Sequence, residues 1–137
     1  MLVRREQLFL EELAESLVLC RGAQIVTTPT GLVVGASGAD GFDIALGAVE
    51  GEYVLSFDRW EETFTDSAYV KSLFQAALRG DARLRIDTLA GKRWRWTLEC
   101  RRSGEDWIAE SSIGVPIWRF WGKPDVIFLR NQYRQGV

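Results

Sequence analysis

The sequence predicts a single α+β domain over residues 1–137, with a mostly antiparallel sheet of about seven strands and two helices packed on one face. A chain of 137 residues with 47% hydrophobic side chains suits one buried core and is short for two domains. Apolar residues recur at helical spacing in two segments, and elsewhere they alternate along short runs. The turns between those runs are too short for parallel crossovers, so neighbouring strands are expected to be antiparallel.

The first helix is predicted over residues 7–19. Arg21 and Gly22 follow it and supply a basic last turn and a stop signal. Its apolar side chains recur at helical spacing and its acidic side chains occupy the opposite face: Leu8, Phe9, Leu13 and Leu17 against Glu11, Glu12 and Glu15. We therefore expect an amphipathic helix, which packs either on the sheet of this chain or on a partner.

Short β-rich runs separated by turn residues follow the first helix. Alternation of apolar and polar side chains is typical of half-buried strands, and Pro and Gly are typical of turns. The turns fall at residues 29–31 and 50–51, and the second of them predicts a β-hairpin. The expected strands are residues 23–28, 31–35, 42–49 and 53–58.

The second helix is expected to begin after Thr65 or Asp66, because either side-chain oxygen can accept a backbone N–H of the first turn. Arg79 and Gly80 are expected to end it, as a C-terminal cation and a left-handed cap. One apolar stripe lies between these ends: Tyr69, Val70, Leu73, Phe74, Ala77 and Leu78.

An antiparallel meander is predicted after the second helix. Strict alternation points Trp94 and Trp96 into the core and Arg93 and Arg95 toward water, and it places Trp107 on the apolar side of its strand. Aromatic and cationic side chains would then lie on opposite faces of the sheet. The expected strands are residues 83–88, 93–101, 107–113 and 126–129, with turns at residues 90–92 and 103–105.

Composition excludes several kinds of chemistry. The chain has no histidine, so Ser–His and Cys–His nucleophile systems and typical His–Cys zinc sites cannot form. Cys20 and Cys100 lie in apolar patterns and are expected to be buried free thiols. The sequence carries no phosphate-loop or dinucleotide motif, and we expect neither a metal nor another cofactor.

Charge and hydropathy argue against two classes of partner. The chain has 17 basic and 19 acidic side chains, whereas nucleic-acid binders usually carry a basic excess. No apolar run approaches the roughly 20 residues that span a bilayer, and glutamates near the N-terminus argue against a secretory signal. We therefore expect a cytoplasmic protein that binds neither nucleic acid nor membrane.

The first candidate site is the polar segment of residues 58–66, between a strand and the second helix. Glu61 and Glu62 could do acid–base work or hold a divalent cation through oxygen ligands. Acidic residues before a helix also stabilise its N-terminus without any further role. Trp60, flanked by charges on an expected connection, is a candidate anchor for a binding partner.

The second candidate site is a row of arginines on the meander, Arg83, Arg85, Arg93 and Arg95, with Arg101 and Arg102 further along the chain. Because alternation separates these cations from the tryptophans, base stacking is not favoured here. Acidic residues on the facing strands are expected to neutralise part of the row through cross-strand pairs. The pattern favours a cationic sheet face that docks an acidic patch of a protein.

The third candidate site lies between Pro116 and Pro124. Trp118 and Trp121 belong there to a segment of three aromatic residues and one arginine, which are residue types that anchor interfaces. The same residues could instead plug the end of the sheet. Both interpretations leave at least one large aromatic side chain partly exposed.

These observations favour a non-catalytic, cytoplasmic protein-binding domain, whose partner is another protein or a second copy. In general character the chain is similar to bacterial immunity and accessory proteins, which act by binding. The alternative is a small-molecule binder or carboxylate-dependent enzyme. Its pocket would be lined by tryptophans and would use Asp58, Glu61 or Glu62 as the polar group.

Overall fold

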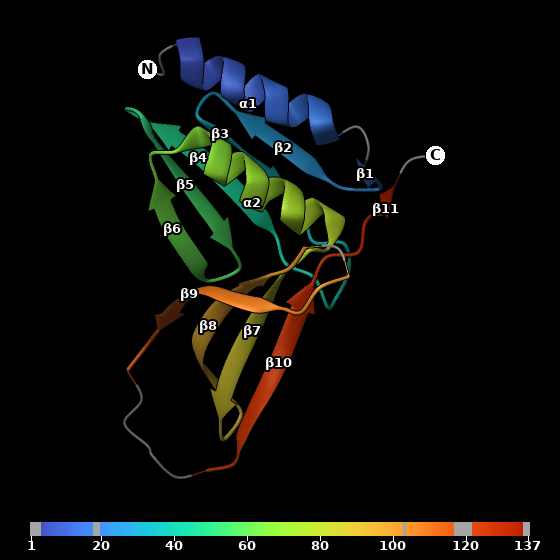
Figure 1. The fold of residues 1–137 in the computed structure, drawn as a ribbon, viewed down its shortest axis with the longest axis vertical. Coiled ribbons are helices and arrows are strands. Elements are labelled where there is room, and N and C mark those ends of the chain that lie inside the picture. The colour runs from blue at the N-terminus through green and yellow to red at the C-terminus, as the bar shows by residue number, and fades with distance from the viewer. Residues whose placement is uncertain (1–3, 18–19, 103, 117–121, 136–137) are drawn as a thin grey trace.

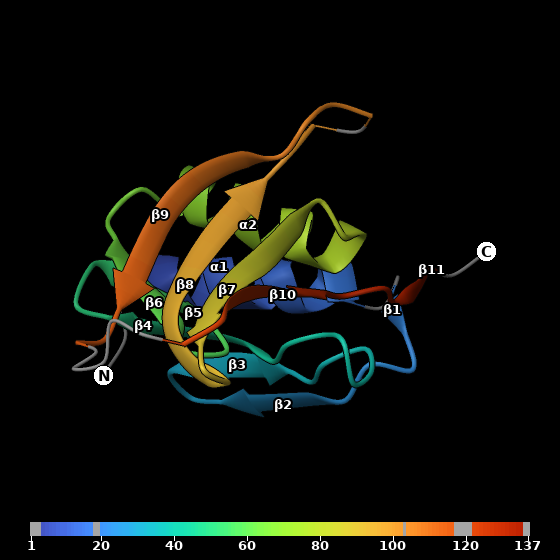
Figure 2. The same cartoon turned by 90° about the horizontal axis from the view of Figure 1, so that it is seen from below.

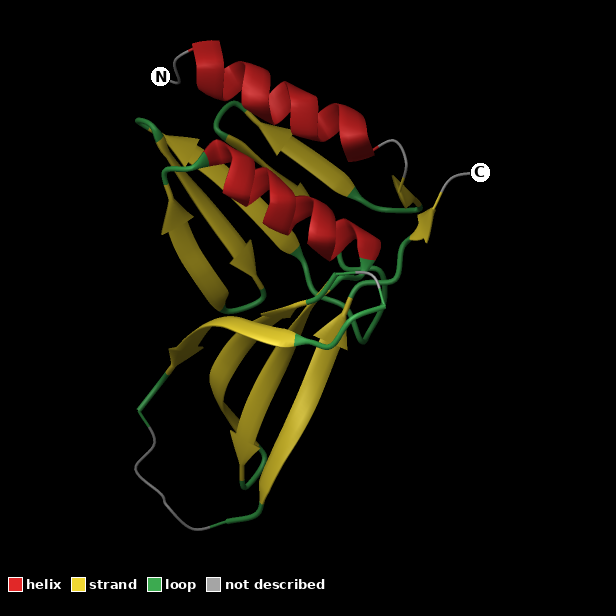
Figure 3. Cartoon of the chain, viewed as in Figure 1, coloured by secondary structure: helices red, strands yellow, loops and turns green. Residues whose placement is uncertain are grey.

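The computed structural model describes residues 4–17, 20–102, 104–116 and 122–135. Within them the fold is α+β, with two helices and two main antiparallel sheets (Figures 1 and 3). The predicted fold class, the antiparallel pairing and the presence of both helices are confirmed. The first helix begins and ends three residues earlier than predicted, at Arg4 and Ser16, so Arg21 does not belong to its last turn and lies instead in a short strand. The strands are divided between a five-stranded and a four-stranded sheet, and β1 (Cys20–Arg21) pairs separately with β11 (Arg134–Gln135).

The five-stranded sheet consists of consecutive hairpins, and its strands are β2 (Ile25–Thr28), β3 (Gly31–Val34), β4 (Ile44–Val49), β5 (Glu52–Phe57) and β6 (Trp60–Phe64). Both predicted turns are present. Glu50 and Gly51 adopt φ angles of 47° and 83°, which match the right-handed twist of the hairpin they close.

Strand β6 differs from the prediction, which placed residues 58–66 on a connection. The chain reverses at Asp58, where φ is 55°, and β6 then pairs with β5 so that Trp60 lies opposite Phe57. The two rings stack with their centroids 5.2 Å apart, and Trp60 is completely buried. Burial of a large indole favours the strand, while the glutamates that follow remain exposed to water.

Helices α1 (Arg4–Ser16) and α2 (Ser67–Arg79) lie on one face of the five-stranded sheet, as predicted (Figure 1). The Asp66 carboxylate accepts the backbone N–H groups of Ala68 and Tyr69, so the expected N-cap is present. Gly80 ends α2 with φ 81°, in the left-handed conformation expected of the C-cap. Helix α1 packs near β3, and α2 packs on β5, β6 and β7.

The four-stranded sheet has the order β10-β7-β8-β9, formed by β7 (Ala82–Leu89), β8 (Lys92–Cys100), β9 (Ile108–Gly114) and β10 (Pro124–Arg130). Its inner face carries Leu84, Ile86 and Leu98 into the hydrophobic core, which is continuous with that of the first sheet. Its outer face points away from the helices, which lie behind the sheet in Figure 2.

Two indole N–H groups connect the two sheets. Trp60 Nε1 donates to Ser111 Oγ at 2.7 Å, and Trp96 Nε1 donates to Asp58 Oδ2 at 3.0 Å. Buried tryptophans need such partners because an unpaired N–H in an apolar interior is costly. The two sheets are therefore held together by specific polar contacts as well as by apolar packing.

Two β-bulges change the faces on which side chains lie in the four-stranded sheet. Asp87 pairs with Arg95 while Thr88 pairs with Arg93, so Trp94 is an extra residue of β8. On β9, Glu110 is an extra residue in the same way, because Leu98 pairs with Ser111 and Glu99 pairs with Ala109. Each extra residue inverts the alternation beyond it.

Candidate functional site

The outer face of the four-stranded sheet concentrates arginines. Three cross-strand rows can be followed from β10 through β7 and β8 to β9: Arg130, Arg83, Glu99 and Ala109; Phe128, Arg85, Thr97 and Ser112; Val126, Asp87, Arg95 and Gly114. We call this surface, together with Arg101 and Trp107, the arginine face.

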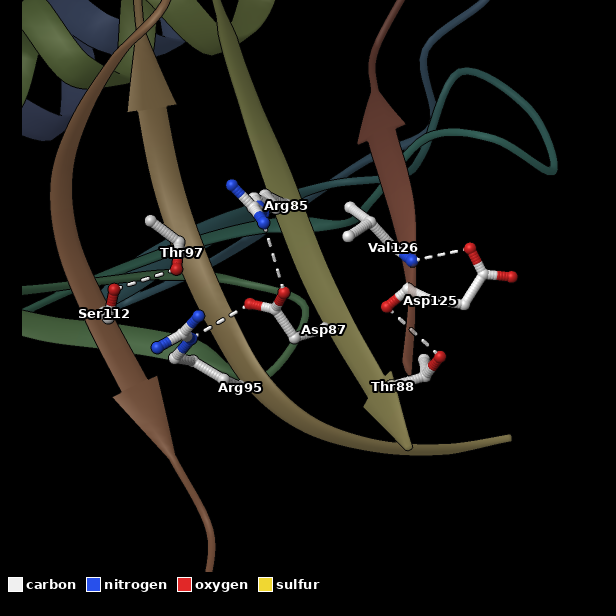
Figure 4. Close-up of polar contacts among 8 residues, drawn as sticks. All are labelled: Arg85, Asp87, Thr88, Arg95, Thr97, Ser112, Asp125 and Val126. Carbon is white, nitrogen blue, oxygen red and sulfur yellow. Dashed lines mark hydrogen bonds and ion pairs between the residues drawn. The ribbon is translucent and has the colours of Figure 1, made fainter. Parts of the chain in front are cut away.

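The centre of the arginine face is an arginine–aspartate–arginine cluster (Figure 4). Arg95 Nε donates to Asp87 Oδ2 at 2.9 Å, and Arg85 Nη2 lies 3.5 Å from Asp87 Oδ1. Thr97 Oγ1 and Ser112 Oγ form a hydrogen bond of 2.8 Å beside this cluster. One carboxylate therefore orients two guanidinium groups on neighbouring strands.

The end of the arginine face nearer α2 combines arginines with aromatic rings. The guanidinium of Arg83 lies between the rings of Trp107 and Phe128, 4.3 and 4.1 Å from their centroids. Arg101 and Arg130 also lie over Trp107, at 4.5 and 5.5 Å. Three cations thus share one indole, an arrangement that cation–π attraction favours.

Ion pairs neutralise only part of the positive charge of the arginines on the arginine face. Arg83 Nε donates to Glu99 Oε1 at 2.7 Å, and Arg101 Nε lies 3.6 Å from Asp81 Oδ1. With Asp87, three carboxylates thus face five arginines, so the arginine face is cationic. Partly exposed pairs of this kind each stabilise the fold by only about 0–1 kcal/mol, so their main effect is to orient the arginines.

The predicted arginine row is partly brought together. Arg83, Arg85 and Arg95 lie on the arginine face as expected, but Arg93 does not. The bulge at Trp94 places Arg93 on the inner side of the sheet, where Nη1 lies 3.9 Å from Asp58 Oδ2. Trp94 instead lies against the guanidinium of Arg95, 4.7 Å from the ring centroid.

The predicted separation of aromatic and cationic side chains is therefore wrong in part. Trp96 is buried, as alternation predicts. Trp107, which directly precedes β9, lies with the arginines, because the bulge at Glu110 exchanges the faces on which the earlier side chains lie. Phe128 joins it from β10 and is 46% exposed. The surface thus offers both charge and apolar area.

The remaining predicted site residues lie elsewhere. Trp60 is fully buried, which removes it from any surface that a partner could contact. Glu61 and Glu62 are exposed, but as adjacent residues of β6 they point to opposite faces of the strand. Trp118 and Trp121 lie outside the described residues.

The geometry gives little support to a tryptophan-lined carboxylate pocket. Trp60 and Trp96 pack in the core, and the Asp58 carboxylate accepts the indole N–H of Trp96. Four hollows of about 380 to 570 Å³ are formed by described residues, and none of them is lined by Asp58, Glu61 or Glu62. The described residues also contain no group of His, Cys, Asp or Glu arranged to hold a metal ion.

The largest of these hollows, of about 570 Å³, is a groove between α2 and the β8–β9 end of the sheet. Burial, together with Glu110 and Asp81, raises the pKa of the Cys100 thiol there to about 12. Burial and then Glu110, Cys100 and Glu62 raise the pKa of Tyr69. The groove therefore holds a protonated thiol and a phenol, neither of which is activated as a nucleophile.

Sequence reasoning missed Trp107, Phe128 and Arg130 as members of the site. One signal for them is the distribution of charge along the chain. Residues 1–80 carry six basic and twelve acidic side chains, whereas residues 81–137 carry eleven basic and seven acidic ones. The small net charge of −2 conceals this asymmetry.

Comparison of the chain with protein-family models, with curated proteins and with solved structures finds no match. Within the described residues, no helix is both long and apolar enough to cross a membrane.

Proposed function

We propose that this chain is a non-catalytic protein-binding domain, which docks an acidic segment of another protein on its arginine face. The observation that carries the proposal is the gathering of five arginines and two aromatic rings on one sheet face, against three carboxylates. Arginine and tryptophan are the residue types most enriched among the contacts that dominate protein interfaces.

The arrangement of the arginines also favours binding. Arg83 is held by Glu99 and two rings, and Arg95 is held by Asp87 and Trp94. Side chains that are already ordered lose less conformational entropy when a partner arrives. Charge complementarity would also accelerate the encounter with an acidic partner at low salt.

We place this activity in the cytoplasm. Among the described side chains, Cys100 has a free thiol, and cytoplasmic proteins keep their thiols reduced.

Octaglutamate is a suitable probe of the arginine face, with octaglutamine as its uncharged control. Wild-type protein is expected to bind octaglutamate, more weakly as salt is added, and to show NMR shift changes confined to β7, β8, β9 and β10. Arg83→Glu combined with Arg95→Glu should weaken binding at least about tenfold, because it reverses two charges of the site.

The matched control is Arg5→Glu with Arg59→Glu, which makes the same change of charge at exposed positions outside the arginine face. It should leave the affinity nearly unchanged, while circular dichroism verifies the fold of both variants. The proposal fails if wild-type protein does not bind octaglutamate, or if both double variants lose affinity equally.

A second copy of the chain is the other occupant that an observation favours. The acidic character of residues 1–80 complements the arginine face, so copies could associate head to tail. Light scattering across protein concentrations would then show growing assemblies that salt or the Arg83→Glu, Arg95→Glu variant dissolves. Such a result would mean that the partner of the arginine face is a second copy of the chain and not another protein.

A further inference from the structure

The three charged side chains at the centre of the arginine face are unequally exposed to solvent. The Asp87 side chain is 10% exposed, whereas those of Arg85 and Arg95 are 42% and 44% exposed. The carboxylate is therefore more buried than the two guanidinium groups between which it lies, and these come from neighbouring strands (Figure 4).

Both arginines keep hydrogen-bond donors that Asp87 does not use. A guanidinium carries five N–H donors in a planar fork. Arg95 contacts Asp87 through Nε, and Arg85 contacts it through Nη2. Arg85 Nε is buried and has no hydrogen-bond partner among the described residues, so the donors that Arg85 can offer to a ligand are those of its Nη atoms. Both arginines thus keep unused Nη donors beside the same carboxylate.

The surroundings of these donors form a shallow recess. A hollow of about 380 Å³ is bordered by Arg85, Asp87, Trp94 and Asp125, and the carboxylate of Asp125 points away from the arginine–aspartate–arginine cluster (Figure 4). Trp94 also supports the guanidinium of Arg95. Gly114 stands beside Arg95 in the cross-strand row and adds no side chain over it. Arg95 does not border this hollow, but its side chain is 44% exposed and that of Arg85 is 42% exposed, so a small group can approach both guanidinium groups from solvent.

We propose that this recess is the anchor of the arginine face and receives one carboxylate of a glutamate or aspartate from the acidic partner. The inference rests on the proposed function, which it makes specific to Arg85 and Arg95. Arginine forks bind carboxylates through two parallel hydrogen bonds, which a simple point charge cannot reproduce.

The charge of the cluster favours a carboxylate over a phosphate. Two arginines and Asp87 leave a single positive charge, which one carboxylate neutralises. A phosphate monoester that carries two negative charges would leave one of them without compensation, next to the Asp87 carboxylate. A nucleic-acid phosphodiester carries one negative charge, as a carboxylate does, and it is the net charge of −2 of the chain that argues against a nucleic-acid partner.

The test is the double variant Arg85→Lys with Arg95→Lys, which keeps both charges and removes both forks. Its affinity for octaglutamate, measured by calorimetry, is expected to fall about tenfold relative to wild type. The matched control, Arg59→Lys with Arg93→Lys, changes two arginines outside the arginine face and should bind within about twofold of wild type. In NMR spectra of wild-type protein, octaglutamate should shift the Nε–Hε signals of Arg85 and Arg95 more than that of Arg83.

The possible outcomes separate this inference from the proposed function. If the lysine variant binds like wild type while Arg83→Glu with Arg95→Glu abolishes binding, the anchor is overturned and the protein-binding face stands. If wild-type protein does not bind octaglutamate, both are overturned. If octathymidylate binds wild-type protein more tightly than octaglutamate and the lysine variant loses that binding, the recess takes phosphate, and the carboxylate anchor is overturned.

Discussion

Asn131 shows how much of this fold depends on a single polar side chain. It is completely buried, and its Oδ1 accepts the backbone N–H groups of Phe42 at 3.0 Å and Ser37 at 3.2 Å. Its Nδ2 donates to the carbonyl of Phe42 at 2.9 Å. Asn131, the residue after β10, thus provides hydrogen-bond partners for backbone groups of the loop before β4, although 89 positions separate it from Phe42 in the chain.

Replacement of this side chain is expected to destabilise the protein strongly. Asn131→Ala leaves buried groups of Phe42 without partners and should lower the free energy of unfolding by about 2–4 kcal/mol, measured by urea denaturation. Asn131→Asp keeps the acceptor and loses the donor, so it should destabilise as well. Gln132→Ala, at the exposed neighbouring position, should cost under about 0.5 kcal/mol. Equal effects of Asn131→Ala and Gln132→Ala would contradict this account.

Cys100 provides a prediction about pH. Burial, helped by Glu110 and Asp81, raises the pKa of its thiol from 9.0 to about 12. Since the folded state then holds this proton more tightly than the unfolded state, the thiol stabilises the fold fully below pH 9. That contribution is lost as the pH rises from about 9 to about 12.

The same pKa shift is expected to protect the thiol from alkylation. Between pH 7 and pH 9, iodoacetamide should modify Cys100 at least about tenfold more slowly in native protein than in urea, because the thiolate is the reactive form. Peptide mapping by mass spectrometry separates this residue from Cys20. Equal rates in the two states would show that the thiol is not shifted.

At the scale of elements, local patterns in the sequence predict most of the strands, both helices and both caps of α2. They succeed where each signal is local, as at Asp66 and Gly80, whose side chain and backbone act on adjacent residues. They fail at β6, because acidic residues in the segment indicate a loop while the buried contact between Trp60 and Phe57 favours a strand.

The candidate site shows why alternation alone was insufficient. Strict alternation of side chains along each strand places Arg83, Arg85 and Arg95 on the correct face of the sheet. It places Arg93 and Trp107 on the wrong face. The errors arise at two β-bulges, each of which adds a residue to one strand and inverts the faces beyond it. The position of a bulge depends on cross-strand pairing and packing, and no residue type in β8 or β9 predicts it.

At the scale of the whole molecule, the division into two sheets depends on contacts that are distant in the sequence. The indole of Trp60 reaches Ser111 from β6 to β9, and the indole of Trp96 reaches Asp58 from β8 to the β5–β6 turn. Short-range patterns contain no information about such pairs. The continuous core beneath both sheets nevertheless makes them one cooperative structure.

This cooperativity leads to a prediction for the contact between Trp60 and Ser111. Trp60→Phe and Ser111→Ala each remove one side of a 2.7 Å hydrogen bond, and a double-mutant cycle should give a coupling energy of about 1 kcal/mol. Because both sheets share one core, each variant should shift a single urea transition that tryptophan fluorescence and circular dichroism report identically. Hydrogen exchange of β7 and β8 should then accelerate together with that of β4 and β5. Separate transitions for the two sheets would instead mean that the four-stranded sheet, with its arginine face, opens independently. The helices and the five-stranded sheet would then not hold the arginines in place.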